Sequence, residues 1–149
     1  MERGDQALAF SLKNQDGQTI NLGDYFGKQS VVLFFYPKDH TPGCTKEACT
    51  FRDFHSEFES LNCKIFGISS DNVAKHKKFA EDFNLKYDLL ADVKKEARKL
   101  YKVPTNLLGL VPGRVTYVID PTGKIAHVFN SQTNPTDHIS EALETIKKF

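Results

Sequence analysis

The sequence predicts a single α/β domain over residues 1–149, with a mixed sheet, helices on both of its faces and an N-terminal hairpin. The continuous apolar run 31–36 is typical of a strand that is buried on both sides, and 65–69 is expected to form a second buried strand. A segment with helical apolar spacing lies between them, and this strand–helix–strand order implies parallel pairing through a right-handed crossover. Two strand-like runs near the C-terminus, 115–119 and 125–129, flank an Asp-Pro-Thr-Gly turn and are expected to pair with each other.

The N-terminal part is expected to form the hairpin and then the central strand. Residues 7–12 alternate weakly, and Thr19–Leu22 follows a turn over Asn14–Gln18 whose Asp-Gly pair favours a tight reversal. Val31–Tyr36 is the expected central strand, and a helix is expected over Thr45–Leu61. The apolar face of this helix has members at spacings of three and four: Phe51, Phe54, Phe58 and Leu61.

The middle of the chain continues the alternation of strands and helices. A second buried strand is expected over Ile65–Ser69, and Asp71 or Asn72 is a candidate cap for the next helix. A short strand over Tyr87–Leu90 and a short helix over Lys94–Tyr101 come after that helix. The inward stripe of the longer helix is expected to contain Val73, His76, Phe79, Ala80 and Phe83.

The last third of the chain is expected to close the sheet. Residues 102–113 hold two prolines and two glycines and are expected to form a loop before the strands Val115–Ile119 and Ile125–Phe129. Thr136 is expected to cap a final helix that runs to Phe149. The inward residues of that helix are expected to be Ile139, Leu143 and Ile146. The whole order of elements matches a thioredoxin-like fold.

The overall composition is ordinary for a globular protein. Apolar residues make up 40% and charged residues 26% of the chain, and the formal net charge is +1. This charge balance gives no reason to expect nucleic acid as a partner. The longest apolar run has about six residues, far fewer than the roughly 20 that span a bilayer, so no membrane association is expected.

Three cysteines are present, an odd number in a chain long enough to bury a core without disulfides. A secreted disulfide scaffold is therefore disfavoured, and a reducing compartment fits better. The N-terminal stretch Met1–Asp5 has neither the basic flank nor the apolar run of a secretory signal. Met1 is either the native start or replaces a removed transit peptide.

The stretch Thr41–Cys44 carries the strongest chemical signal. It follows the run 31–36 and Pro37, so Cys44 is expected where a loop turns into a helix. Backbone N–H groups at a helix start favour negative charge, and this favours the thiolate, which is the nucleophilic form of cysteine. Cys49 is five residues further on, close enough to trap an oxidised Cys44 as a disulfide. The alternative, a buried cysteine that only fills space, is disfavoured by the polar and turn-forming neighbours.

Three further residues are candidates for the environment of this thiol. Thr41, three residues before Cys44, can cap the helix, hydrogen-bond beside the sulfur, or do both. Pro37 stiffens the loop by fixing φ. Arg114 opens the strand 115–119, where its charge would stabilise a thiolate, with an ordinary surface arginine as the alternative. Two other arginines are weaker candidates: Arg52 and Arg98.

The remaining polar and sulfur-bearing residues predict no metal site. Cys63 precedes a strand-like run and is expected to fill the core. The five histidines show no paired spacing of the kind that a zinc site needs, and His40 with the two nearby cysteines lacks a fourth ligand. Glu47 either orders the first helical turn after Cys44 or faces solvent, and the sequence leaves both readings open.

The segment from Pro37 to Cys44 resembles the peroxiredoxin signature, in which a proline is followed by three residues, a threonine, two residues and a cysteine. The continuation to Cys49 is similar to the peroxiredoxin Q branch, also called bacterioferritin comigratory protein. The resemblance extends over nearly the whole chain. Three further segments are similar to that branch: Phe51–Asp53, Gly67–Ser69 and Pro112–Asp120.

The resemblance implies a role for each candidate. Cys44 matches the peroxidatic cysteine, and Cys49 matches the resolving cysteine, although not every member of the branch has one. Thr41 matches the threonine that hydrogen-bonds the peroxide oxygen, and Arg114 matches the arginine that completes the pocket. Pro37 matches the proline that shields the sulfur.

By this resemblance the chain is expected to be a thiol peroxidase for hydrogen peroxide and organic hydroperoxides. A Cys44 sulfenic acid would be resolved by Cys49 as an intramolecular disulfide, and thioredoxin or a similar dithiol would reduce it. No metal, flavin or haem is expected, and a monomer is expected. The segment Val103–Gly113 is more similar to cyanobacterial and chloroplast members. The expected location is therefore the cytoplasm of a bacterium, with cyanobacteria among the candidates, or the chloroplast if a transit peptide has been removed.

Two other functions stay open on the same fold. A thiol–disulfide oxidoreductase normally uses Cys-x-x-Cys, whereas four residues separate Cys44 from Cys49. A non-catalytic peroxide sensor would use the same thiol but pass its oxidised state to a partner.

Overall fold

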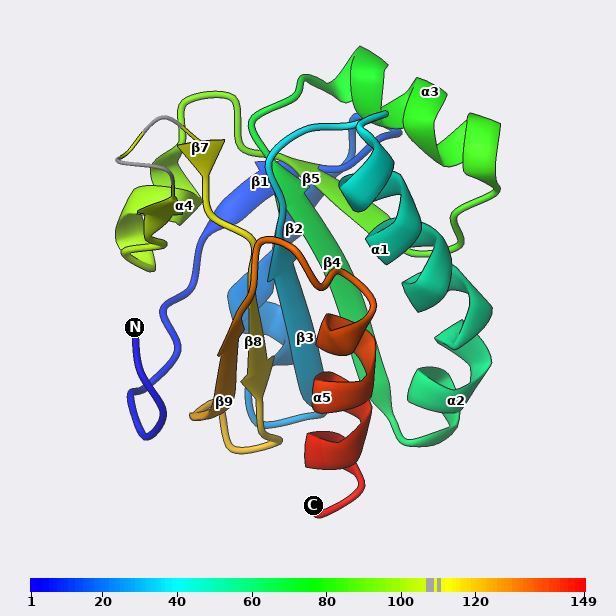
Figure 1. Ribbon diagram of the computed structural model, residues 1–149. Coiled ribbons are helices and arrows are strands. Elements are labelled where there is room, and N and C mark those ends of the chain that lie inside the picture. Colours follow the sequence, from blue (N-terminus) through cyan, green and yellow to red (C-terminus); the bar gives the residue numbers. More distant parts are fainter. Residues whose placement is uncertain (107–108, 110) are drawn as a thin grey trace.

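A computed structural model of the chain describes residues 1–106, 109 and 111–149. Its centre is a five-stranded sheet (Figure 1). From one edge to the other the strands are β5 (Asp88–Ala91), β4 (Cys63–Ser69), β3 (Ser30–Phe35), β8 (Val115–Ile119) and β9 (Ile125–Asn130). Strands β3, β4 and β5 are parallel, whereas β8 pairs antiparallel with both β3 and β9. The predicted mixed sheet is confirmed.

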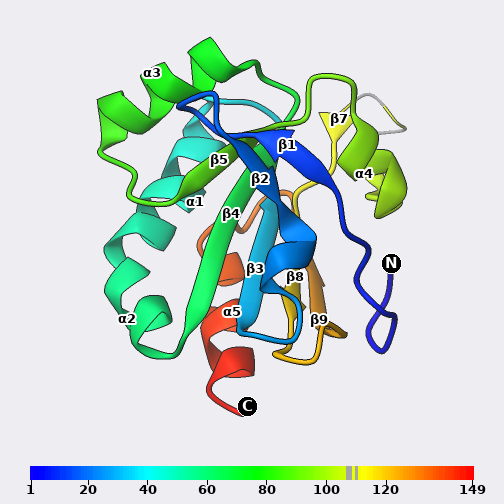
Figure 2. The ribbon, with the colours of Figure 1, turned by 180° about the vertical axis from the view of Figure 1, so that it is seen from behind.

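Packed layers cover both faces of the sheet. One face packs against the helices α1 (Pro42–Asp53), α2 (His55–Ser60), α3 (Val73–Phe83) and α5 (Asp137–Ile146). The view from behind shows the other face (Figure 2), with the hairpin β1 (Ser11–Lys13) and β2 (Thr19–Asn21), the 3-10 helix η1 (Leu22–Tyr25) and α4 (Glu96–Leu100). Successive residues of β3 enter the two cores alternately, because neighbouring strand residues point to opposite faces.

The single helix predicted over Thr45–Leu61 is wrong. Two helices, α1 and α2, replace it and meet at Phe54, whose φ of −100° and ψ of 7° leave helical geometry. Phe51 and Phe58 are fully buried, whereas Phe54 and Leu61 are 37% and 39% exposed. The spacing of apolar residues indicates which side chains can share a face, but it does not indicate where the backbone hydrogen bonds are interrupted.

The loop predicted over 102–113 contains a short antiparallel pair, β6 (Thr105–Asn106) and β7 (Val111–Pro112). Residues 107, 108 and 110 of that predicted loop lie outside the described residues. Strands of two residues are too short to show the alternation from which a strand is predicted.

The predicted helix caps have different outcomes. Asn72 is the N-cap of α3, and its side chain accepts a hydrogen bond from the Lys75 backbone N–H, as expected. Thr136 occupies the N-cap position of α5, but its side chain makes no capping hydrogen bond with any described residue. Helix α5 ends before the predicted Phe149. Its three expected inward residues are buried: Ile139, Leu143 and Ile146.

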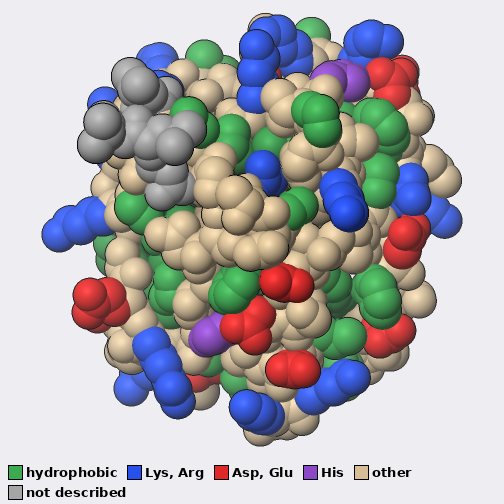
Figure 3. All heavy atoms as spheres, in the orientation of Figure 1, with side chains coloured by type: hydrophobic (Ala, Val, Ile, Leu, Met, Phe, Trp, Pro, Cys, Tyr) green, Lys and Arg blue, Asp and Glu red, His purple; other side chains and the backbone are tan. Residues whose placement is uncertain are grey.

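The surface carries charges of both signs. On the face in Figure 3, Lys and Arg side chains are interspersed with Asp and Glu side chains, in agreement with the net charge of +1. Among the helices formed by residues 1–106, 109 and 111–149, none is long and apolar enough to cross a membrane.

Candidate active site

Cys44 lies in the first turn of α1, at the end of the loop that leaves β3. Thr41 is the N-cap residue, and Pro42 occupies the first helical position, where its missing N–H costs no hydrogen bond. The Cys44 side chain is only 1% exposed. The unpaired N–H groups and the dipole of the helix start favour negative charge at this position. The geometry therefore agrees with the predicted loop-to-helix position, although the helix begins three residues earlier than predicted.

Arg114 reaches the sulfur from the other side of the site. Its Nη2 donates a hydrogen bond to Cys44 Sγ over 3.4 Å, and its Nε donates to the Gln132 carbonyl over 3.2 Å. The register of the antiparallel pair explains the approach, because Phe35 of β3 lies opposite Val115 of β8. The residue before β8 and the loop after β3 consequently emerge at the same end of the sheet. Arg114 is 4% exposed, so the alternative of a surface arginine is wrong.

Two glycines leave room for this approach. A Cβ atom at Gly43 would lie 3.0 Å from Arg114 Nη2, closer than an ordinary van der Waals contact. A Cβ atom at Gly113 would lie 2.1 Å from the Pro104 carbonyl oxygen, so no residue with a side chain fits at this position. Gly43 therefore leaves room for the Arg114 guanidinium, and Gly113 lets the chain before Arg114 pass against the Pro104 backbone.

Glu47, for which the sequence left two readings open, is completely buried beside Arg114. Its Oε1 accepts a hydrogen bond from Arg114 Nη1 over 2.7 Å. Burial raises the pKa of Glu47 to about 8, although the guanidinium opposes the shift. The signal in the sequence was the spacing: a residue three positions after Cys44 lies on the same side of a helix. Of the two readings, solvent exposure is wrong.

His138 of α5 lies next to the second oxygen of this carboxyl group. Its Nδ1 lies 3.5 Å from Glu47 Oε2, an oxygen without a hydrogen-bond partner among the described residues. The same nitrogen lies 2.7 Å from the Thr116 hydroxyl, and Nε2 donates to the Ser131 carbonyl over 2.8 Å. Burial lowers the pKa of His138 to about 4, so the ring is neutral near pH 7. No feature of the sequence pointed to this contact.

Thr41 and Pro37 lie in the loop between β3 and α1. The Thr41 hydroxyl donates to the Lys38 carbonyl over 2.8 Å, which closes the loop, and it makes no capping bond with a described residue. The predicted side-chain cap is thus wrong, because the Thr41 oxygen accepts no backbone N–H of the first turn of α1. Its oxygen keeps lone pairs with which to accept a further hydrogen bond. Pro37 is partly buried at the start of the loop.

All three cysteines are free thiols. Cys49 is partly buried in α1, and burial raises the pKa of its thiol. Cys63 at the start of β4 is 7% exposed and packs in the core, as predicted. Burial also raises the pKa of the Cys63 thiol, to about 11, so that this cysteine stays protonated at neutral pH.

The two arginines that were ranked as weaker candidates contact other parts of the fold. Arg98 is 8% exposed and donates hydrogen bonds to the backbone carbonyls of Gly113 and Tyr36. It thereby links the residue before Arg114 to the residue that follows β3. Arg52 binds Asp53 and a backbone carbonyl at the end of α3. Arg98 thus holds two backbone segments next to the site, and its position on a short helix did not predict these contacts.

Residues 3–128 match the model of the AhpC/TSA family. A curated relative from Triticum aestivum, "Peroxiredoxin Q, chloroplastic", is 44% identical over 147 residues, which cover 99% of this chain and 67% of the relative. The protein of the same name from Arabidopsis thaliana is 45% identical, with 99% and 68% covered. Among solved structures, peroxidoxin BcpB from Mycobacterium tuberculosis superposes with a TM-score of 0.91 at 39% identity and covers 100% of this chain and 98% of its own. A PrxQ mutant from Xylella fastidiosa superposes with a TM-score of 0.90 at 29% identity, with 99% and 96% covered.

Proposed function

Because this chain belongs to the AhpC/TSA family, and its relatives place it among the peroxiredoxin Q peroxidases, we propose that Cys44 is the residue that reduces peroxides. The observation that carries the proposal is the hydrogen bond from Arg114 Nη2 to Cys44 Sγ at the first turn of a helix. A guanidinium and a helix start both stabilise a thiolate. The proposed substrates are hydrogen peroxide and organic hydroperoxides.

The first step is attack of the Cys44 thiolate on the terminal oxygen of the peroxide. The O–O bond breaks as the S–O bond forms, Cys44 becomes a sulfenic acid, and the other oxygen leaves and takes up a proton to give water or an alcohol. Arg114 stabilises the charge that moves onto the leaving oxygen, and the Thr41 hydroxyl oxygen accepts a hydrogen bond from the peroxide O–H. Pro37 shields the sulfur from bulk water.

The second step regenerates the thiol. The Cys49 sulfur attacks the Cys44 sulfenic sulfur, releases water and forms a disulfide. A dithiol of the thioredoxin type then reduces that disulfide by exchange and becomes oxidised itself. Burial raises the pKa of Cys49 in the folded state, so exposure of this thiol would favour its attack.

We propose that the protein acts as a monomer without nucleic acid, membrane or metal partners, in the cytoplasm of a bacterium or in a chloroplast. The plant relatives are named as chloroplastic, which supports the second location. The ordinary charge balance supports the absence of nucleic acid.

The test is peroxide consumption coupled to thioredoxin, thioredoxin reductase and NADPH. We expect sustained turnover by the wild type and none by Cys44→Ser, with Cys63→Ser as the matched cysteine control that keeps turnover. A single stoichiometric oxidation without turnover would favour the sensor. Reduction of insulin disulfides without peroxide consumption would favour the thiol–disulfide oxidoreductase.

A further inference from the structure

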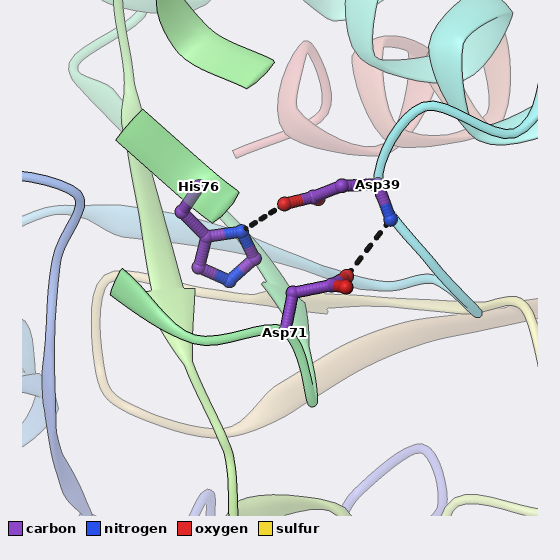
Figure 4. Close-up of side chains that lie close together, drawn as sticks. All are labelled: Asp39, Asp71 and His76. Carbon is purple, nitrogen blue, oxygen red and sulfur yellow. Dashed lines mark hydrogen bonds and ion pairs between the residues drawn. The ribbon is translucent and has the colours of Figure 1, made fainter. Parts of the chain in front are cut away.

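Asp39 is a buried acidic residue in the middle of the loop that carries Pro37 and Thr41. It is 4% exposed, whereas its neighbours Lys38 and His40 are exposed. Its side chain points from the loop to His76 of α3, and its backbone N–H points to Asp71 at the end of β4 (Figure 4). A carboxyl group in such a position requires partners, because burial of an unpaired polar group is costly.

The hydrogen bonds of His76 define how it holds Asp39. His76 Nε2 lies 3.0 Å from the Leu90 carbonyl oxygen, which only accepts, so this nitrogen carries a proton. His76 Nδ1 and Asp39 Oδ2, 2.7 Å apart, then share one further proton between them. Asp39 Oδ1 accepts a hydrogen bond from the Tyr36 hydroxyl over 2.5 Å. Both oxygens of Asp39 and both nitrogens of His76 are therefore engaged.

Asp71 holds the backbone of the same residue. Its Oδ2 accepts the Asp39 N–H over 2.8 Å and the Ser69 hydroxyl over 2.6 Å. Ligand atoms of Asp39, Asp71 and His76 lie within 4.8 Å of one another, as in a cation site. Hydrogen bonds within the protein already use both Asp39 oxygens, both His76 nitrogens and Asp71 Oδ2, so the cluster is explained as a hydrogen-bonded anchor.

The next residue of the loop also contacts α3. His40 has a left-handed backbone conformation with φ of 64°, which is strained for a residue with a side chain. Its Nε2 lies 2.9 Å from Asp82 Oδ2, and its ring packs on Phe79 with 5.0 Å between the centroids. Two consecutive loop residues are thus fixed on one helix, directly before Thr41.

We propose that Asp39, held by His76 and Asp71, is a positioning residue for the peroxide reaction. This inference rests on the proposed function of Cys44. The anchor fixes the loop immediately before α1, and it thereby sets where Thr41 and the first turn with Cys44 stand relative to Arg114. Reactive groups need this precision, because a displacement of about 1 Å can lower a rate about 100-fold.

The test compares Asp39→Ala with the isosteric Asp39→Asn. An asparagine can donate its amide N–H to a neutral His76 Nδ1 and accept from Tyr36, so its hydrogen bonds survive without the charge. We expect Asp39→Ala to lower the second-order rate of Cys44 oxidation by about 10- to 100-fold. We expect Asp39→Asn to restore the rate to within about threefold. Asn14→Ala is the control, because Asn14 is 2% exposed and holds the N-terminal hairpin turn instead.

Amide hydrogen exchange provides a readout that needs no peroxide. We expect the amide of residue 39, which is bonded to Asp71, and the Thr45 amide, which is bonded to the Thr41 carbonyl, to exchange at least about tenfold faster in Asp39→Ala than in the wild type, and to keep wild-type protection in Asn14→Ala. Tyr36→Phe, which removes one hydroxyl, serves if Asp39→Ala does not fold, and it is expected to accelerate exchange of the Asp39 amide. Unchanged exchange and an unchanged oxidation rate in these loop variants would overturn the anchor. A wild type that does not consume peroxide would instead contradict the proposed function, while the exchange result would still decide on the anchor.

Discussion

Arg114 Nη2 donates a hydrogen bond to Cys44 Sγ over 3.4 Å although Arg114 lies 70 positions further along the chain. The same guanidinium uses Nη1 for the Glu47 carboxyl group at 2.7 Å. A planar group with several donors in fixed directions can serve both partners at once. The sulfur and the carboxyl group are therefore linked through one rigid cation.

Replacement of Arg114 by lysine is expected to slow peroxide reduction although the positive charge remains. A lysine ammonium is a point charge that cannot reproduce the planar fork. Loss of one preorganised donor typically lowers a rate by about 10²–10³. Stopped-flow oxidation of Cys44 measures the effect, with Arg52→Lys as the control because Arg52 binds Asp53 outside the site. A wild-type rate in Arg114→Lys would show that the arginine has only a structural role.

Gly43→Ala is expected to lower the rate of Cys44 oxidation. The new Cβ would lie 3.0 Å from Arg114 Nη2, and Glu47 and the Gln132 carbonyl restrain that guanidinium from moving away. We expect about a tenfold slower oxidation of Cys44. Alanine in place of glycine inside a helix is favourable by about 0.5–1 kcal/mol, which offsets part of the steric cost in the free energy of unfolding. Lys46→Ala in the same helix is the control, and equal oxidation rates in the two variants would contradict the steric argument.

Glu47→Gln is expected to change how stability depends on pH. Burial raises the pKa of Glu47 from 4.5 to about 8, so between these values the folded protein holds a proton that the unfolded chain has released. The stability contributed by this proton is complete below pH 4.5 and is lost as the pH rises through about 8. Glutamine keeps an acceptor for Arg114 and does not titrate. Between about pH 5 and about pH 9, the free energy of unfolding of the variant should therefore rise relative to that of the wild type, by on the order of a few kcal/mol.

Urea unfolding at several pH values measures this difference. Glu57→Gln, an exposed glutamate on α2, is the control and should follow the wild-type curve. Parallel curves for Glu47→Gln and the wild type would mean that the buried carboxyl group keeps an ordinary affinity for protons.

The sequence predicted the sheet and the thiol better than it predicted the surroundings of the thiol. Buried strands are read from continuous apolar runs, and the loop-to-helix position of Cys44 follows from the residues on either side of it. The break at Phe54 was missed because Phe51 and Phe58 keep helical spacing across it. The spacing of apolar residues indicates which side chains share a helix face, but it does not indicate whether the helix is continuous.

The site also depends on contacts between residues that are distant in the chain, which local sequence patterns do not predict. Arg114 was a candidate because it opens a strand, whereas its approach to Cys44 depends on the register between β3 and β8. His138 and Asp39 are polar residues whose burial arises from tertiary packing, so the sequence alone gave no reason to select them. In a sequence, a polar residue that is buried with hydrogen-bond partners cannot be distinguished from a polar residue on the surface.

The roles of the two other cysteines can be separated by mutation. Cys49→Ser is expected to keep the first oxidation of Cys44 but to lose efficient recycling by thioredoxin. Cys63→Ser should turn over near the wild-type rate, because Cys63 packs in the core. Single-turnover and steady-state kinetics compare the two variants. Full recycling by Cys49→Ser together with failure of Cys63→Ser would reverse the assignment of the resolving cysteine.

Disulfide formation between Cys44 and Cys49 is expected to unwind the first turns of α1. Both residues lie within this one helix, Pro42–Asp53. Five residues of α-helix give a rise of about 7.5 Å and a Cα separation of roughly 8.7 Å. Bridged cysteines need Cα atoms within about 6.8 Å, so the intact helix cannot close the bond.

Hydrogen exchange on the reduced and oxidised protein measures this opening. We expect the amides of residues 44–50 to lose protection on oxidation, because the end of a helix opens at low cost. The amides of α5 provide the internal control, since α5 holds neither cysteine. Unwinding would also separate Cys44 from Arg114, which would expose the disulfide to a reductant. Equal protection of residues 44–50 in both redox forms would exclude the pairing of Cys44 with Cys49 within an intact α1.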